Sequence, residues 1–92
     1  MKYQAEELML HECYKILEER NDAAASLEEQ LERASIQFEA ARRALSLVNR
    51  LTPGETRGRH ASRVMNFLNR IRSQMAMLSK TIEHYVVSEE NE

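Results

Sequence analysis

Apolar residues recur every seven positions along the first half of this 92-residue chain. The phase starts at Tyr3 and reaches Leu45 without a slip, and a second row lies three positions further on. A repeat that averages about 3.5 residues is typical of a helix packed along another helix. The pattern therefore predicts an all-α chain whose helices need helical neighbours. The first row is Tyr3, Leu10, Leu17, Ala24, Leu31, Phe38 and Leu45, and the second is Cys13, Arg20, Leu27, Ala34, Ala41 and Val48, in which only Arg20 is not apolar.

The strongest break in this pattern lies at Thr52-Pro53-Gly54-Glu55. Thr52 can cap a helix, Pro53 suits a first helical position, and Glu55 completes a capping box. We therefore expect one helical domain over 1–92, an antiparallel helical hairpin of coiled-coil type. It has a helix over about 3–50, a turn over about 51–59, a second helix over about 60–87 and a frayed tail over 88–92.

A break in the long first helix near residues 21–25 is the alternative. Asp22 can cap a new helix, and Ser26-Leu27-Glu28-Glu29 also reads as a capping box. Such a break would give three helices, near 3–20, 22–51 and 57–87. Because a loop has no reason to preserve the seven-residue phase, we favour one helix, roughly 70 Å long at 1.5 Å per residue.

The predicted second helix is shorter than the first and would cover it only back to about Ala23. About 20 N-terminal residues would then lack an intramolecular neighbour although they are rich in apolar side chains, and such patches usually mark interfaces. We therefore expect assembly into a helical bundle. The predicted core seam is Leu10, Leu17, Leu27, Leu31, Phe38, Leu45, Val48, Val64, Leu68, Ile71, Met75, Leu78, Ile82 and Tyr85. The predicted partner-facing residues are Met9, Tyr14, Ile16, Ile36 and Leu47.

No motif for catalysis, metal binding or a cofactor stands out. His11 and Cys13 are two residues apart, so on a helix they point in different directions, and we expect Cys13 to face the seam. His60 and His84 are expected in solvent. With 42% hydrophobic residues, no apolar run long enough for a bilayer and a single cysteine, the chain fits a cytoplasmic protein. We expect no enzyme, no cofactor and no membrane span.

Charge divides the chain into acidic, basic and acidic stretches. Residues 41–80 carry nine basic residues against Glu55 alone, while both flanking stretches are acidic. Arg57, Arg59 and Arg63 near the turn could contact an anion or nucleic acid. We favour pairing of these arginines with acids along and between helices, because aromatic and lysine-rich segments are missing around them.

Three segments resemble the E-type helical-hairpin co-chaperones of type III secretion needle subunits. These are Leu27-Glu28-Glu29-Gln30-Leu31, the turn at Pro53-Gly54, and Ile82-Glu83-His84-Tyr85-Val86. The resemblance implies a cytoplasmic co-chaperone that docks on a tetratricopeptide-like chaperone and keeps a self-polymerising subunit soluble. Our prediction is a non-enzymatic protein–protein interaction module, a small co-chaperone or assembly-scaffold subunit that pairs with itself or with another helical protein. The alternative is a homo-oligomeric bundle that binds nucleic acid through its arginine-rich corner.

Overall fold

The computed structural model describes residues 2–19 and 25–90, and within these ranges the chain is all-helical. Helix α1 spans Lys2–Glu18, α2 spans Leu27–Val48 and α3 spans Glu55–Glu90. The molecule is a rod whose Cα atoms extend over 62 × 19 × 15 Å. The predicted all-α class is confirmed for the described ranges. The side chains of Tyr3 and Tyr85 lie outside the described part of the chain, as do residues 91–92 of the predicted tail.

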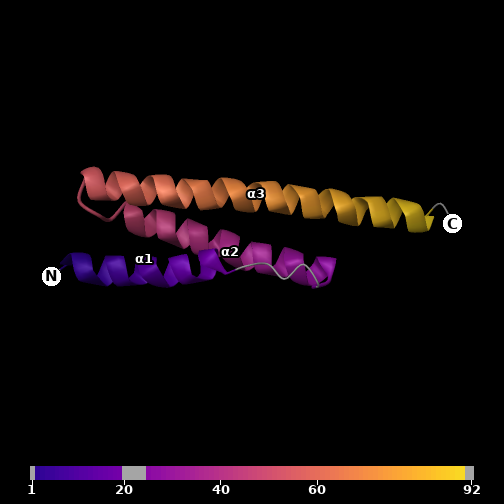
Figure 1. The fold of residues 1–92 in the computed structure, drawn as a ribbon, viewed down its shortest axis with the longest axis horizontal. Helices are drawn as coiled ribbons and strands as arrows, with labels where there is room; N and C mark the ends of the chain where they lie inside the picture. Colours follow the sequence, from indigo (N-terminus) through magenta and orange to yellow (C-terminus); the bar gives the residue numbers. More distant parts are fainter. Residues whose placement is uncertain (1, 20–24, 91–92) are drawn as a thin grey trace.

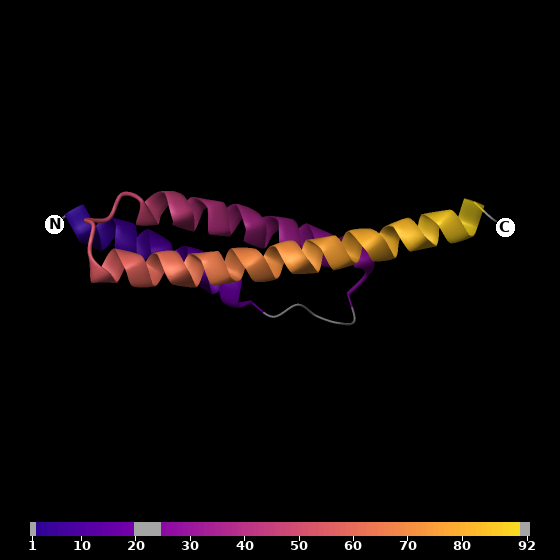
Figure 2. The same cartoon turned by 90° about the horizontal axis from the view of Figure 1, so that it is seen from above.

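The prediction of one long first helix over about 3–50 is wrong, because α1 and α2 are separate helices. Figures 1 and 2 show that α1 folds back beside α2, so that the N-terminus and the start of α3 lie at the same end of the rod. Helices α2 and α3 lie side by side and run in opposite directions. The expected 21–25 break falls largely on residues outside the described ranges. The N-terminal residues therefore find their neighbours within the chain.

Local capping explains where α2 starts and where α1 stops. The Ser26 hydroxyl accepts a hydrogen bond from the Glu29 amide at 3.1 Å, which completes the N-cap that the sequence offered. At the other side, the buried Gln37 amide donates from Nε2 to the carbonyl oxygens of Ile16 and Glu19, at 3.1 Å each. Helix C-termini leave carbonyl groups without intrahelical partners, and Gln37 satisfies these two from across the interface.

The turn before α3 is shorter than expected. Helix α3 begins at Glu55, where the Gly58 amide donates to the Gly54 carbonyl at 3.0 Å, rather than at Pro53 or near residue 60. The helix also continues to Glu90, beyond the predicted end near residue 87. None of the helices in the described part of the chain has both the length and the apolar character needed to cross a bilayer.

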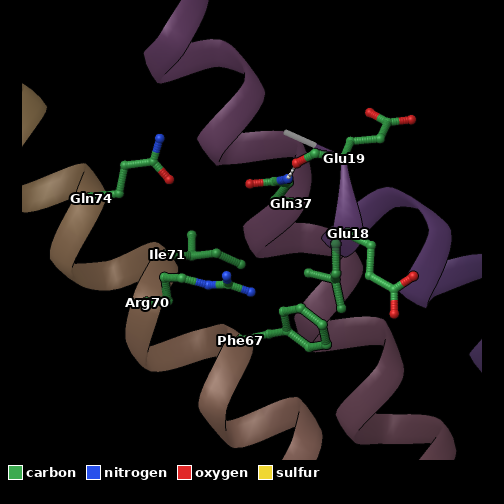
Figure 3. Close-up of a pocket in the computed structure, with 8 residues that line it drawn as sticks. Glu18, Glu19, Gln37, Phe67, Arg70, Ile71 and Gln74 are labelled. Atoms are coloured by element: carbon green, nitrogen blue, oxygen red, sulfur yellow. Dashed lines mark hydrogen bonds between the residues drawn. The ribbon is translucent and has the colours of Figure 1, made fainter. Parts of the chain in front are cut away.

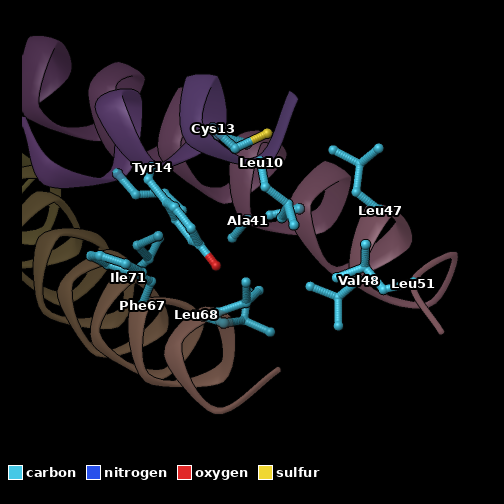
Figure 4. Packing of buried hydrophobic residues seen from close by; sticks show 14 residues of the cluster. Leu10, Cys13, Tyr14, Ala41, Leu47, Val48, Leu51, Phe67, Leu68 and Ile71 are labelled. Atoms are coloured by element: carbon cyan, nitrogen blue, oxygen red, sulfur yellow. The ribbon is translucent and has the colours of Figure 1, made fainter. Parts of the chain in front are cut away.

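One apolar core joins the three helices (Figure 4). Helix α2 contributes mainly small residues to it: Ala34, Ala41 and Ala44 have no exposed surface. Larger side chains reach this surface from α1 and α3. Small residues allow helix axes to approach closely, so the three helices share a thin core. The other large core residues are Leu10, Cys13, Tyr14 and Leu17 of α1, Leu47 and Val48 of α2, Leu51 of the turn, and Val64, Phe67, Leu68, Ile71 and Leu78 of α3.

Candidate protein-binding groove

A cluster of aromatic and charged side chains fastens α1 to α3. The Tyr14 hydroxyl and His60 Nδ1 share a hydrogen bond of 2.6 Å, and the two rings stack with centroids 5.8 Å apart. The Arg63 guanidinium lies 4.1 Å above the Tyr14 ring and pairs with the Glu18 carboxylate. Phe67 completes the cluster, 6.2 Å from Tyr14. These contacts fix the position of α1 along the length of α3.

Burial changes the acid–base chemistry of two α1 side chains. Desolvation raises the pKa of Tyr14 above its ordinary value of 10.0, against an opposing effect of the Arg63 charge and with a smaller upward effect of Cys13. Desolvation likewise raises the pKa of the Cys13 thiol above 9.0, opposed by Arg43 and assisted by Glu12. Both groups therefore stay protonated at neutral pH, which suits a packing role and does not suit a nucleophile.

A groove of about 580 Å³ opens where α1 ends. Helix α1 reaches only about halfway along α3, and the groove continues its line between α2 and α3 (Figures 1 and 3). Leu17, Phe67 and Ile71, all buried, supply its apolar floor. The polar rim consists of Glu18, Glu19, Gln37, Arg70 and Gln74.

The rim offers both a positive charge and fixed amide groups. The Arg70 guanidinium lies 5.2 Å from the centroid of the Phe67 ring, and no carboxylate among the described residues forms an ion pair with it. The side chain of Gln37 is held in place because its Nε2 atom donates a hydrogen bond to the Glu19 carbonyl at the end of α1. Its amide oxygen points away from Glu19 in Figure 3. The groove can therefore take an apolar side chain on its floor and a carboxylate at Arg70.

The structure gives the predicted partner-facing residues different places. Met9 and Ile36 are exposed, at 50% and 53%. Ile16 is half-buried and lies with Ile36 along a shallow groove of about 330 Å³ between α1 and α2. Tyr14 and Leu47 are both 3% exposed, which corrects their assignment as partner-facing. They are buried because α1 folds back onto the pair of helices that was expected to leave it uncovered.

The predicted seam residues fall into two groups. Of the thirteen seam residues that the structure describes, seven are buried and six are half-buried. The buried residues are Leu10, Leu17, Val48, Val64, Leu68, Ile71 and Leu78, joined by Cys13 as expected for the seam-facing thiol. The half-buried residues are Leu27, Leu31, Phe38, Leu45, Met75 and Ile82.

The three arginines proposed as anion contacts already have partners within the chain. Arg57 donates to the Asn49 side-chain oxygen at 3.5 Å, Arg59 lies 4.0 Å from the Glu55 carboxylate, and Arg63 holds Glu18 and Tyr14. His84 is exposed as expected, whereas His60 is half-buried because Tyr14 covers it. In the described ranges, no group of three His, Cys, Asp or Glu side chains could hold a metal ion.

Sequence reasoning missed the roles of Gln37 and Arg70. Gln37 occupies a position between Ala34 and Ala41 on the buried face of α2, and a polar residue on an alanine-rich buried face was the available signal. Arg70 could not be distinguished from its neighbours in the basic stretch. In comparisons with known proteins, no family model matches the chain, and no curated protein or solved structure does either.

Proposed function

We propose that this protein is a non-enzymatic interaction module that binds an amphipathic helical segment of another protein in the groove beyond α1. The groove between α2 and α3 carries the proposal, since α1 occupies the first half of this surface and ends at Glu18. Helix-in-groove recognition places apolar anchors at i, i+3, i+4 and i+7. Helix α1 itself docks in this way, through Leu10, Cys13, Tyr14 and Leu17.

The open end of the rod supports the same proposal. Beyond the reach of α1, the seam residues Leu27, Leu31 and Ile82 are only half-buried, and Met77 is 67% exposed. A bound helix would remove this apolar surface from water, at about 25 cal/mol for each Å² buried. The segment that fits is apolar along one stripe and carries a carboxylate that reaches Arg70, much as Glu18 reaches Arg63 one helical repeat earlier.

A chaperone or scaffold role is the most concrete form of this function. The resemblance to needle-subunit co-chaperones implies that the bound helix belongs to a self-polymerising subunit or to a tetratricopeptide-like chaperone. Covering the apolar stripe of such a subunit would keep it from polymerising. Identification of the bound protein decides between this role and a more general scaffold role.

Site-specific crosslinking tests the groove directly. A photoreactive amino acid at Gln74, in the groove, should give one adduct with a different protein in the cells of origin, while the same group at the exposed Asn69 should not. With the crosslinked protein purified, Arg70→Glu should weaken binding at least tenfold and Arg59→Glu should leave it nearly unchanged. Equal adducts at both positions, or none at Gln74, would refute the proposed groove.

A further inference from the structure

The seam between α2 and α3 consists of two rows that differ in burial. One row contains Ala34, Ala41 and Val48 on α2 and Val64, Ile71 and Leu78 on α3, and all six are buried. The second row lies beside it, and there Leu31, Phe38, Leu45 and Met75 are only half-buried. The larger side chains of α2 thus stand in the row that the chain covers less.

The second row lies on the side of the rod that α1 does not cover. On α2, Phe38 is about half a helical turn away from Ala40 and Leu47, the residues toward α1, at about 100° per residue. On α3, Met65 is separated in the same way from Arg63, which holds Tyr14 of α1. We define this surface as the back stripe: Leu31, Phe38 and Leu45 on α2, with Met65 and Met75 on α3. Met65 is 40% exposed there.

We propose that a second copy of this chain packs on the back stripe in the opposite direction. Helices α2 and α3 of the two copies then form a four-helix core, and α1 covers the outer side of each pair. This surface is separate from the groove beyond α1, so the proposal goes beyond the binding of a foreign helix. Four-helix packing encloses a seam that two helices leave partly wet.

The charges along the rod select a second copy in this orientation. The turn end of the α2–α3 pair is basic: Glu55 is the acid of α2 and α3 there, and Glu7 of α1 lies beside the turn. The opposite end of α2 is acidic, with Arg33 and Lys80 as bases nearby. A two-fold axis across the helices brings the basic end of each copy to the acidic end of the other, whereas parallel packing would set arginines against arginines. The basic residues are Arg42, Arg43, Arg50, Arg57 and Arg59; the acidic residues are Glu28, Glu29 and Glu32.

The back stripe is also large enough to form a dimer interface. Helix α2 has 22 residues and is therefore about 33 Å long. Two helices about 10 Å apart present a strip about 20 Å wide, which gives roughly 600 to 700 Å² on each copy. The two copies together would bury about 1,300 Å², within the range of specific interfaces though near its lower end. We therefore expect a reversible dimer that dissociates on dilution.

Solution mass of the intact chain tests the proposal. Sedimentation over a concentration series should show a shift from the 10.7 kDa chain toward twice that mass. Met65→Glu should raise the dimer dissociation constant at least tenfold at unchanged helix content, while Met77→Glu, at an exposed position off the stripe, should not. A monomer at every concentration, or equal effects of the two variants, would overturn the proposal.

Charge reversal tests the orientation. Glu28→Lys combined with Glu32→Lys should weaken the dimer, and Arg42→Glu combined with Arg50→Glu in the same chain should restore it. Failure of this restoration would overturn the antiparallel arrangement. In the wild type, oxidation of Met65 by hydrogen peroxide should slow as concentration rises while that of Met77 does not, which needs no folded variant. The Gln74 adduct is independent of these outcomes, so failure of the dimer and failure of the groove are distinguishable.

Discussion

The Tyr14 hydroxyl on α1 lies 2.6 Å from Nδ1 of His60 on α3, although 46 positions separate the two residues in the chain. The hydroxyl donates when Nδ1 is the unprotonated ring nitrogen. The bond sits between the stacked rings of the same two residues, which are partly shielded from water. It ties the helix that folds back to the helix that is last in the sequence, so it reports directly on whether α1 is docked.

Stability at alkaline pH should depend on Tyr14 and Cys13. Because the fold raises both pKa values, the folded chain holds these protons more tightly than the unfolded chain. The resulting stability is complete below the ordinary values of 9.0 and 10.0 and is lost as pH rises through the folded values. We expect the free energy of unfolding, measured with urea, to fall above about pH 9.

Tyr14→Phe isolates the tyrosine part of this effect. The variant should lower the free energy of unfolding at neutral pH by about 0.5 to 1.5 kcal/mol, because it removes one hydrogen bond. It should also remove the part of the fall in unfolding free energy that occurs at the highest pH, where the tyrosine hydroxyl titrates. An unchanged alkaline decline in Tyr14→Phe would contradict the assignment of that decline to the buried hydroxyl.

Gln37 should matter more than any other polar residue of α2. Gln37→Leu keeps the volume but removes two hydrogen bonds to the end of α1, and the free energy of unfolding should fall by about 1 to 3 kcal/mol. Hydrogen exchange should speed up in the last turn of α1 and stay slow in α3. Gln74→Leu, on the edge of the groove, should leave exchange in α1 as it is. Equal exchange rates in both variants would show that Gln37 does not cap α1.

Arg63 should stabilise the fold chiefly through the Tyr14 ring. The side chains of the Arg63–Glu18 pair are about half-exposed, at 48% and 53%, so solvent screens their attraction. We therefore expect Glu18→Gln to cost less than about 0.5 kcal/mol and Arg63→Ala to cost about 1 kcal/mol from the lost contact with the ring. A double-mutant cycle measured at low and high salt separates the two parts. A larger effect for Glu18→Gln than for Arg63→Ala would reverse this order.

The sequence predicted the all-helical class, a turn at Pro53-Gly54 and the buried row of α3, whereas on α2 four of the five residues it named for the core are only half-buried. These features follow from the local repeat and from Pro53 and Gly54, which act over a few residues. The break between α1 and α2 could not be decided in this way, because the Ser26 cap and the continuous seven-residue phase favoured different answers.

The break between α1 and α2 depends instead on contacts between residues that are distant in the chain. Gln37 reaches carbonyl groups 18 and 21 positions earlier, and Tyr14 meets a histidine 46 positions later. The seven-residue repeat does not show which residues so far apart in the chain will be in contact. The same limit applies to the groove: Leu17, Phe67 and Ile71 were recognisable as core residues, but their convergence beyond the end of α1 depends on the direction in which α1 folds back.

The alanines of α2 have a consequence for how this chain can vary. The middle helix touches a neighbour on two sides, and Ala34, Ala41 and Ala44 have no exposed surface. A bulkier residue at these positions would push a neighbouring helix away, and overpacking of this kind typically costs about 1 to 3 kcal/mol. Variation in size is therefore easier to accommodate on the two outer helices, whose large side chains can be exchanged for others of similar volume.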